Sequence, residues 1–579
     1  MAGGRTRTAW RAITVAAILG VAGTPAAAAE TVVHQQFTVV ASDGVELQAT
    51  LTGSGSIAPR PTVVEFSPYG RNAGTLAVGP EYNTLLVQIR GTGDSDGSFD
   101  ALGPRTQRDV REVLEWACSQ PWSGGQLAIN GFSASAITIY NSLHQELPCV
   151  KAMVLRSGTY SLYRDLLMPG GISNLGPAAG VMLLIGAPAL AQSPARISDP
   201  ASGLAILLGL LSTGLEGGFG HPTLDSWWKE RQFRGNANTI PTLVIDGFFD
   251  VESRGAFQGY QELRSSGAHL LVVGAHDGAP AGTDNGVPEA NAWLDHHVRG
   301  VENGVDEHPR VQMLLSRGDR EDYLAGDFAR RTADDWPVPG TTWTALSFSP
   351  ARSGSARSLN DGSLLKTRPT IQQAQTYLSV PSLPSATDPA TIALLGAAGL
   401  NALTTSVPIL TDMTLADAAG LTFTTAPLTQ DVASAGPLAL QVSLSTSVPG
   451  TGIWAVLSDV SADGVGHPLT AGRLNTDFPG VVAAESLQDQ QGRIVQPFGD
   501  YEHASPAKPL MYRSYQVEFW PVGNVFEKGH RIRVTIVGAS AASRPSVPAV
   551  NAIRVGGPQG AQLLVPALPG SNLGAALPN

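Results

Sequence analysis

The residues with the clearest potential for chemistry lie in the segment 126–140, where an apolar stretch runs into Gly131-Phe-Ser-Ala-Ser135 and then into a helix-like stretch. This order is typical of a nucleophile elbow, in which a serine occupies a strained turn between a strand and a helix. The residues two before and two after that serine must be small, so that strand and helix can approach closely. Gly131 and Ser135 meet this requirement, although glycine is usual at the second position. The pattern therefore predicts Ser133 as a nucleophile, against the alternative of a Gly-Ser turn without chemistry.

A serine hydroxyl is a weak nucleophile, so a histidine must take its proton and a carboxylate must orient that histidine. In hydrolases of this kind the acid and then the histidine follow the serine along the chain, each in a loop after a strand. Asp250 ends one apolar run after the nucleophile, and His276 ends the next. Asp246 is a rival acid, but it lies inside its run. We therefore predict Asp250 as the orienting carboxylate and His276 as the general base. The other histidines considered for this role lie at the start of a strand or in a polar helix: His269, His296 and His297.

The elbow also supplies one group that stabilises the negative oxygen of the transition state. The backbone N–H of the residue after the nucleophile, Ala134, stands at the N-terminus of the predicted helix. A second donor must come from another part of the chain.

These residues require a sheet to position them, and the first half of the chain predicts one. Short apolar runs alternate with amphipathic stretches up to about residue 300, which is typical of a mostly parallel sheet covered by helices. A helical period over 108–118 precedes the run that leads to Ser133. The predicted strands are 62–66, 83–89, 126–130, 152–156, 242–246 and 269–273.

The rest of the chain departs from this alternation. Residues 157–238 are rich in Gly, Ala, Leu and Pro and predict a cap inserted between two strands; its apolar stretches, 180–191 and 204–215, are too short to span a membrane. From residue 309 onward, β-type alternation predicts a β-sandwich, with strands at 438–444, 454–460, 515–519 and 531–537. Residues 359–420 receive no firm assignment, and the Pro/Gly-rich tail after Gly556 is expected to be only partly ordered.

The N-terminal segment, the net charge and the cysteines indicate where the protein is located and which binding partners are excluded. Positive charge, about 12 apolar residues from 12 to 23 and small residues at 25–29 predict a cleaved signal peptide over residues 1–29, so the mature protein is expected to be secreted. An uncleaved anchor is the alternative, but the run is shorter than the roughly 20 residues of a spanning helix. The net charge of −11, without a basic cluster, argues against a nucleic-acid partner. In an exported protein, Cys118 and Cys149 are expected to pair as a disulfide rather than remain free thiols.

Several motifs together resemble the Xaa-Pro dipeptidyl-peptidase and cocaine esterase family of α/β-hydrolases. The matching segments run in the same order, from Ser67-Pro-Tyr-Gly70 and Arg90-Gly-Thr-Gly-Asp-Ser-Asp-Gly97 through 115–122 to 292–300. Segments 421–428, 456–464 and 519–533 resemble the C-terminal jelly-roll domain of that family. The resemblance implies an α/β-hydrolase domain over 30–308 and a jelly-roll domain over 309–579.

The resemblance also implies a second oxyanion donor, the hydroxyl of Tyr69, for which a packing role is the alternative. Two positions depart from the family pattern. Ala134 stands where relatives commonly carry tyrosine, and Gly274-Ala275 stands where they carry Pro-Trp. Neither departure removes a catalytic group. His530 falls in a family segment before a strand and is expected to be structural.

The function predicted from these residues is hydrolysis of an ester or amide bond in a small-molecule or peptide substrate through an acyl-enzyme, with no cofactor or metal. A dipeptidyl-peptidase would need an anionic subsite for a free amine, which the sequence does not identify. Acyl transfer to a hydroxyl acceptor uses the same triad and is an alternative. A catalytically inert binding protein is a further one, disfavoured by the intact set of serine, acid and histidine.

Overall fold

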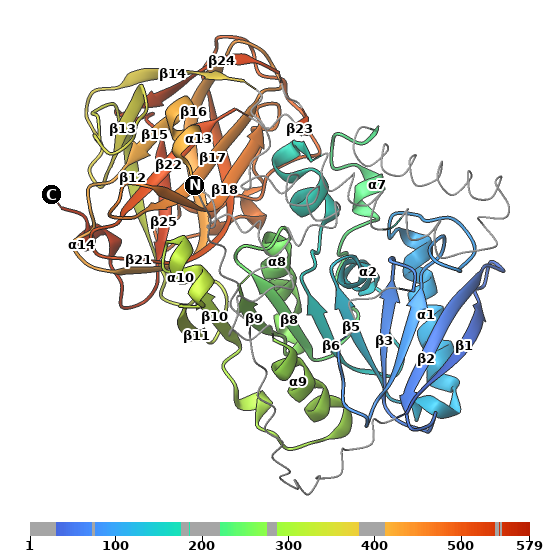
Figure 1. Cartoon of the computed structure of the whole chain (residues 1–579). Helices are drawn as coiled ribbons and strands as arrows, with labels where there is room; N and C mark the ends of the chain where they lie inside the picture. The colour runs from blue at the N-terminus through green and yellow to red at the C-terminus, as the bar shows by residue number, and fades with distance from the viewer. Residues whose placement is uncertain are drawn as a thin grey trace, which may run out of the picture.

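The first half of the chain forms a ten-stranded sheet in the order β1-β2-β4-β3-β5-β6-β8-β9-β10-β11 (Figure 1). The computed structural model describes residues 31–71, 76–174, 185, 220–274, 286–380, 412–538, 543–544 and 547–578. Pairing is parallel from β4 to β10, and antiparallel between β1, β2 and β4 and between β10 and β11. The strands are β1 (Val32–Val40), β2 (Glu46–Ser54), β3 (Thr62–Ser67), β4 (Asn83–Gln88), β5 (Leu127–Phe132), β6 (Val150–Arg156), β8 (Thr242–Gly247), β9 (His269–Val273), β10 (Val311–Leu315) and β11 (Ala329–Ala333).

The six strands predicted in this half are confirmed, with ends that shift by one or two residues. Their apolar runs form strands because both faces of the sheet are covered: every residue of β3 and of β8 is buried. The first sheet also extends past residue 308, because β10 pairs with β9 and β11 pairs with β10.

Helices cover the two faces of this sheet, and the alternation of side chains along β5 shows how. Leu127 and Ile129 pack in the cluster that includes helices α1 (Pro104–Ser119), α2 (Ala134–Ser142) and α8 (Ser253–Leu263). Ala128 points the other way, into the cluster with Trp293 and Leu294 of α9 (Val287–Arg299). The helical period predicted at 108–118 is confirmed by α1.

Only the two ends of the predicted cap lie within the described residues. They contain the helical turns η2 (Leu162–Leu167), η3 (Pro169–Gly171) and α7 (Ser226–Lys229), and the short strand β7 (Ser173–Asn174), which pairs with β23 (Ser543–Arg544). Most of the two apolar stretches predicted at 180–191 and 204–215 lies outside the described part of the chain. No described helix is both long and apolar enough to cross a membrane.

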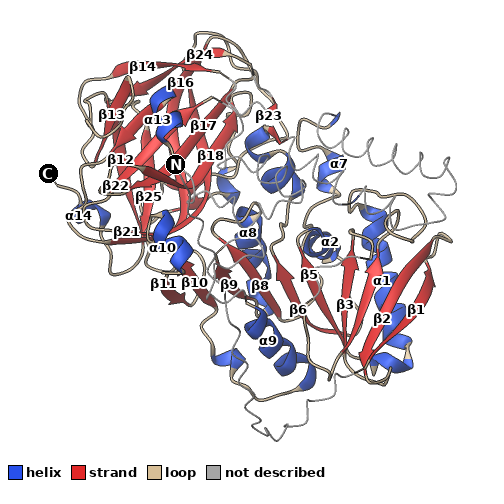
Figure 2. Ribbon diagram, viewed as in Figure 1, coloured by secondary structure: helices blue, strands red, loops and turns tan. Residues whose placement is uncertain are grey.

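The second half of the chain is built almost entirely of strands (Figure 2). Hydrogen bonds join them into an eleven-stranded sheet, and an additional pairing of β16 with β25 closes it into a barrel. The predicted strand content is thus confirmed, while the two faces of the predicted sandwich belong to one continuous sheet. The strands are β12 (Thr342–Ser349), β13 (Asn360–Leu365), β14 (Gln373–Ser379), β15 (Leu421–Thr424), β16 (Val432–Thr446), β17 (Gly452–Val460), β18 (Gly466–Asn475), β21 (Arg513–Phe526), β22 (Arg531–Val537), β24 (Ala549–Val555) and β25 (Gln562–Ala567).

One expectation for this half is wrong. The tail after Gly556 is ordered, because β25 pairs with β12 and a final helix α14 (Leu573–Ala576) follows. Leu563 and Leu573 are fully buried, so the tail contributes to the core despite its glycines and prolines. The unassigned region 359–420 contributes β13, β14 and α13 (Thr414–Ala419), while 381–411 lies outside the described residues. The remaining short elements are α10 (Arg320–Ala325), β19 (Leu487–Gln488), β20 (Ile494–Gln496), η1 (Pro121–Ser123), η6 (Arg264–Ser266), η7 (Val305–Glu307) and η9 (Ala483–Glu485).

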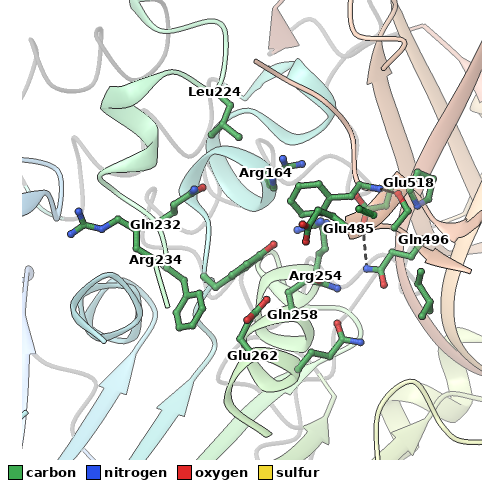
Figure 3. Close-up of a pocket in the computed structure, with 18 of the residues that line it drawn as sticks. Arg164, Leu224, Gln232, Arg234, Arg254, Gln258, Glu262, Glu485, Gln496 and Glu518 are labelled. Carbon is green, nitrogen blue, oxygen red and sulfur yellow. Dashed lines mark hydrogen bonds and ion pairs between the residues drawn. The ribbon is translucent and has the colours of Figure 1, made fainter. Parts of the chain in front are cut away.

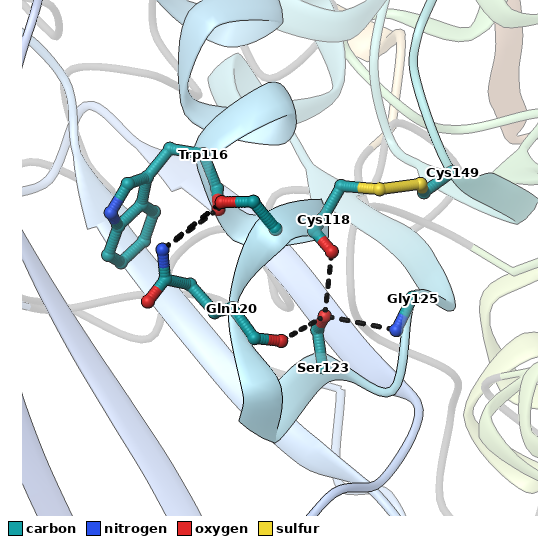
Figure 4. The surroundings of a disulfide bond; sticks show 7 residues. Trp116, Cys118, Gln120, Ser123, Gly125 and Cys149 are labelled. Atoms are coloured by element: carbon teal, nitrogen blue, oxygen red, sulfur yellow. Dashed lines mark hydrogen bonds between the residues drawn. A yellow bond between two sulfur atoms is a disulfide. The ribbon is translucent and has the colours of Figure 1, made fainter.

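The two cysteines form a disulfide, which confirms that prediction over free thiols (Figure 4). Cys118 lies in the last turn of α1, and Cys149 directly precedes β6, with 6.0 Å between their Cα atoms. Beside it, the Ser123 hydroxyl donates to the carbonyl of Gln120 and accepts from the N–H of Gly125. The bridge lies at the edge of the sheet where β5 and β6 begin, opposite the edge where Ser133 follows β5.

Candidate active site

Ser133 occupies a strained turn between β5 and α2. Its backbone has φ 53° and ψ −123°, a positive φ that a residue with a side chain rarely adopts. Strain of this kind costs about 1–3 kcal/mol and is concentrated at functional sites. Two hydrogen bonds hold the turn: the N–H of Ser133 donates to the carbonyl of Arg156 at 2.9 Å, and its carbonyl accepts from the N–H of Ile137 at 3.1 Å. This is the geometry predicted for a nucleophile elbow.

The small residues around the turn allow strand β5 and helix α2 to approach closely, as predicted. A Cβ on Gly131 would lie 2.6 Å from the Cα of Ala136, so strand and helix could not keep their present distance. Ser135, which replaces the usual glycine, is fully buried, and its hydroxyl donates to Oε1 of Glu65 at 3.3 Å. A serine is accommodated at this position because a buried carboxylate accepts its hydrogen bond.

Tyr69 and Ala134 meet directly beside Ser133. The N–H of Ala134 donates to the Tyr69 hydroxyl at 3.1 Å, and the same hydroxyl is hydrogen-bonded to the Ser133 side chain. Burial raises the pKa of Tyr69 to about 12, and the bonds to Ser133 and Ala134 partly oppose that rise. The phenol therefore keeps its proton at neutral pH and is a hydrogen-bond donor. The structure brings together the elbow, the backbone donor and the tyrosine that the sequence picked out separately.

Two buried acids near this group were missed by sequence reasoning. The charges of Glu252 and Glu65 both raise the pKa of Tyr69, so both carboxylates lie close to the phenol. Glu65 stands in the middle of β3 and accepts from Nδ2 of Asn130 at 2.9 Å. The available signal was a charged residue inside an otherwise apolar strand, because a buried charge requires built-in partners.

Asp250 and its rival Asp246 occupy different environments. Asp250 lies in the loop between β8 and α8, is buried, and accepts from the N–H of Glu252 at 2.8 Å. Asp246 lies within β8 and is completely buried, with the N–H of Gly247 as donor to Oδ1 at 2.6 Å. Burial and then the negative charge of Asp250 raise the pKa of Asp246 well above its usual range. Asp246 therefore holds a proton to a higher pH than an ordinary carboxyl group.

The predicted base, His276, lies outside the described residues, which stop at residue 274 after β9 and resume at 286. His269 is the first residue of β9 and so lies at the edge of the sheet away from Ser133, as expected. His530 lies in the second domain, where its Nδ1 is 2.9 Å from Oδ1 of the buried Asp459. This ion pair is consistent with a structural role for His530.

A buried ion-pair network connects the two domains next to the site. Arg254, in the first turn of α8, places Nη1 2.6 Å from Oδ1 of Asp165 and Nε 2.8 Å from Oε1 of Glu518 in β21. Burial disfavours the charged guanidinium, but the two carboxylates outweigh it and raise the pKa of Arg254. The network fixes α8, and with it the preceding loop that carries Asp250, against the second domain.

A pocket of about 700 Å³ lies beside this network, and its lining comes from α8, the two ends of the predicted cap and the second domain (Figure 3). Its lining includes Arg164, Arg254, Glu262, Glu485 and Glu518, so charges of both signs face it. Neither Ser133, Tyr69 nor Asp250 is among its lining residues. This pocket is therefore an interdomain cavity, separate from the elbow.

Comparisons with known proteins place both halves of the chain in one family. Residues 43–277 match the family described as X-Pro dipeptidyl-peptidase (S15 family), and residues 303–551 match the X-Pro dipeptidyl-peptidase C-terminal non-catalytic domain. A cocaine esterase from Rhodococcus sp. is 24% identical over 545 residues, which cover 85% of this chain and 88% of that protein.

Two solved structures share the fold at low identity. A CocE/NonD family hydrolase from Staphylococcus aureus is 17% identical with a TM-score of 0.72, over 93% of this chain and 94% of its own. An α-amino acid ester hydrolase is 17% identical with a TM-score of 0.70, over 95% and 99% of the two chains. The protein is thus an enzyme of the serine hydrolase class. Within that class, the chain belongs to the X-Pro dipeptidyl-peptidase and cocaine esterase family.

Proposed function

We propose that this protein hydrolyses ester or amide bonds through an acyl-enzyme formed on Ser133, with His276 as general base and Asp250 as the carboxylate that orients it. The observation that carries the proposal is the geometry at the elbow. Ser133 sits in a strained turn with φ 53°, and the N–H of Ala134 and the hydroxyl of Tyr69 meet beside it. A nucleophile next to two hydrogen-bond donors is the arrangement that acyl transfer requires.

The proposed reaction uses each group once per step. The Ser133 oxygen attacks the substrate carbonyl carbon while His276 takes the hydroxyl proton, and the carbonyl oxygen becomes an oxyanion. The N–H of Ala134, which donates to the Tyr69 hydroxyl in the free protein, and the O–H of Tyr69 then both donate to that oxyanion. When the intermediate collapses, His276 gives the proton to the leaving alcohol or amine, and the acyl group stays on Ser133. Water, activated by His276, then releases the acid and restores the serine.

The proposed class of substrate is inferred from the family to which the chain belongs. Proteins similar to this chain are named for an ester, cocaine, for α-amino acid esters and for X-Pro dipeptides, all of which react at an acyl carbon. The proposal is therefore an acyl hydrolase. Dipeptidyl-peptidase activity and transfer of the acyl group to an alcohol use the same residues and are separated by experiment.

We further propose that the first domain has the α/β-hydrolase fold and the second the jelly-roll fold. In support, a strand, a strained serine and a helix follow one another in the first domain, and an acid lies in the loop after a later strand of the same sheet. The second domain is an antiparallel-rich sheet that closes on itself. A crystal structure with the strand connections traced would test both assignments.

We also propose that the protein is secreted after cleavage near residue 29. The disulfide between Cys118 and Cys149 supports this, because such bridges persist in oxidising compartments. Intact-mass measurement of protein recovered from the culture medium of the producing cell should give a chain that starts near Glu30. Recovery only from the cell interior, with an unprocessed N-terminus, would contradict the proposal.

The experiment that tests the activity combines a covalent probe with a substrate panel. A fluorophosphonate should label the wild-type protein, and Ser133→Ala should lose both labelling and turnover while keeping its melting temperature. The buried Ser135→Ala is the matched control, because it removes a neighbouring hydroxyl and should still label. p-Nitrophenyl esters of increasing chain length, Xaa-Pro anilides and an added alcohol acceptor separate esterase, dipeptidyl-peptidase and transferase activity. Labelling that persists in Ser133→Ala would overturn the assignment.

A further inference from the structure

A second cluster of chemically capable side chains lies at the end of α9. His296 and His297 occupy the last turn of this helix, and Asp306 follows in the 3-10 turn η7. One carboxylate oxygen of Asp306 lies 2.8 Å from Nε2 of His296, and the other lies 3.2 Å from Nε2 of His297. The ligand atoms of all three residues lie within 4.8 Å of one another. In the sequence, these two histidines stand out only as rivals of His276.

The orientation of His296 is suited to binding a metal ion. Its Nδ1 lies 2.9 Å from the carbonyl of Val301, and because a carbonyl only accepts, this nitrogen carries the hydrogen. In the neutral ring, Nε2 then has a lone pair and faces the cluster. A backbone carbonyl that fixes the tautomer in this way is the usual outer partner of a metal-binding histidine.

His297 provides the second nitrogen under different constraints. Its ring packs edge-on against Trp293, with ring centroids 4.2 Å apart, which fixes its direction. Its buried Nε2 makes no hydrogen bond within the described part of the chain, although it lies beside the Asp306 carboxylate.

An ordinary ion pair accounts for only part of this arrangement. A protonated His296 beside Asp306 is such a pair, and an ion pair alone explains the contact between these two residues. A second imidazole nitrogen directed at the same carboxylate is not needed for it. Two imidazoles and one carboxylate form the ligand set that suits Zn²⁺ and the related late first-row divalent ions, with one position left for water.

We propose that His296, His297 and Asp306 bind a divalent ion of the Zn²⁺ class. The site lies at the edge of the sheet opposite the elbow, because the Trp293 ring also contacts His269, the first residue of β9. Its role is therefore structural: the ion ties the C-terminus of α9 to the turn that leads into β10, which is the path from the first domain toward the second.

The test uses the untagged full-length mature protein, stripped with a chelator and titrated with Zn²⁺ above the ordinary pKa of histidine. Calorimetry should give about one ion per chain, and Zn²⁺ should raise the melting temperature. Asp306→Asn keeps the shape of a half-exposed side chain and should fold, yet weaken Zn²⁺ binding by more than about 100-fold, beyond the usual loss for an outer partner. His297→Ala should do the same.

The matched control is His308→Ala, a nearby exposed histidine that pairs with a single acid, Glu289. Its Zn²⁺ affinity should equal that of the wild type. As a second readout, Co²⁺ bound to the wild type should give a visible absorption band that Asp306→Asn lacks. Absence of Zn²⁺ binding by the wild type, or equal affinity in the wild type, Asp306→Asn and His297→Ala, would overturn the proposal. Zn²⁺ binding by Ser133→Ala should match the wild type, so the result is independent of the proposed catalytic role.

Discussion

At the scale of single residues, the site depends on hydroxyl and carboxyl groups whose protonation is set by burial. Tyr69 is a donor because its raised pKa keeps the phenol neutral. In the free protein, the N–H of Ala134 donates to the hydroxyl of Tyr69. Asp246 and Asp250, four residues apart, differ in environment because one is inside a strand and the other is in the loop that follows.

Tyr69→Phe should lower kcat by about two to three orders of magnitude, the usual loss when one oxyanion donor is removed. The KM should change little, because the donor acts mainly in the transition state. Steady-state kinetics on a p-nitrophenyl ester measures both. Tyr377→Phe, which removes a buried hydroxyl in the second domain, is the control and should leave kcat unchanged. A kcat within a factor of about two of wild type would assign Tyr69 to packing and leave the oxyanion to backbone donors alone.

Asp246→Asn should keep most of the activity, because the raised pKa of Asp246 lets this carboxyl group hold its proton to a higher pH than usual and an amide is a close substitute for it. Asp250→Asn should abolish the activity, because it removes the carboxylate proposed to orient His276. The stabilities of the wild type and of Asp246→Asn should also diverge with pH. Because the folded-state pKa of Asp246 is raised, wild-type stability falls as the pH rises above about 4, the unfolded pKa, toward the folded value. Asp246→Asn lacks this loss, so its melting temperature should rise relative to that of the wild type as the pH increases over that range. A difference in melting temperature between the wild type and Asp246→Asn that stayed constant with pH would contradict the raised pKa of Asp246.

At the scale of elements, the close contact between β5 and α2 creates the strained turn. Gly131 in the strand faces Ala136 in the helix, and Gly158 after β6 approaches the same alanine from the other side, where a Cβ would lie 2.5 Å from that of Ala136. Three elements thus converge on one small side chain. The turn can remain strained because the packing around it leaves no room to relax.

Gly131→Ala should therefore push α2 away from β5, destabilise the protein by about 1–3 kcal/mol and lower kcat strongly. Its φ is in the ordinary range, so the effect is due to crowding rather than backbone strain. Gly574→Ala, where the nearest neighbouring atom is 3.4 Å away, is the control. Urea unfolding and ester turnover measure the two effects. Wild-type kcat in Gly131→Ala would mean that the elbow does not depend on this contact.

The disulfide joins the end of α1 to the start of β6, far from the elbow. Replacing both cysteines by serine should cost about 3–4 kcal/mol, as expected from a bridge that closes a loop with a sequence separation of 31. The kcat of the folded protein should not change, because the bridge lies at the opposite edge of the sheet. Urea unfolding with and without reductant measures the loss. A large drop in kcat at unchanged fold would show that this edge is coupled to the site.

At the scale of the whole molecule, the second domain contacts the loop that carries Asp250. Gly523 in β21 lies against the ring of Phe248, two residues before Asp250, so closely that a Cβ would overlap the ring. Ser316, after β10, donates its N–H to the carbonyl of Gly523, and the carbonyl of Ser316 accepts from the N–H of Val525. Together with the Arg254 network, these contacts fix the acid loop from outside the catalytic domain.

Gly523→Ala should therefore lower kcat by about 10- to 100-fold, the scale expected when a catalytic group moves by about 1 Å. The substitution lies in the domain that the family description calls non-catalytic, so a loss of kcat would show that this domain positions the loop that carries Asp250. Gly574→Ala in the same domain should not change kcat. If Gly523→Ala retained wild-type kcat with a lowered melting temperature, the contact would serve stability alone.

The sequence by itself predicted the strands of the first sheet and the strained turn at Ser133, because these depend on local periodicity and short motifs. The roles of Asp250 and His276 stay predictions that rest on the order of the motifs along the chain. It also predicted the disulfide from compartment and cysteine count. It could not find Glu65 and Glu252 near Tyr69, or the contact of Gly523 with Phe248, since these join residues far apart in the chain.

Tertiary structure alone decided these contacts, and it overturned the expectation for the tail after Gly556. There, glycines and prolines lowered the local signal for order, but pairing with β12 buries Leu563 and Val565. Long-range pairing gains more from burial than local propensity loses. The convergence of His296 and His297 with Asp306 has the same origin: the turn after α9 brings the acid back to the helix end.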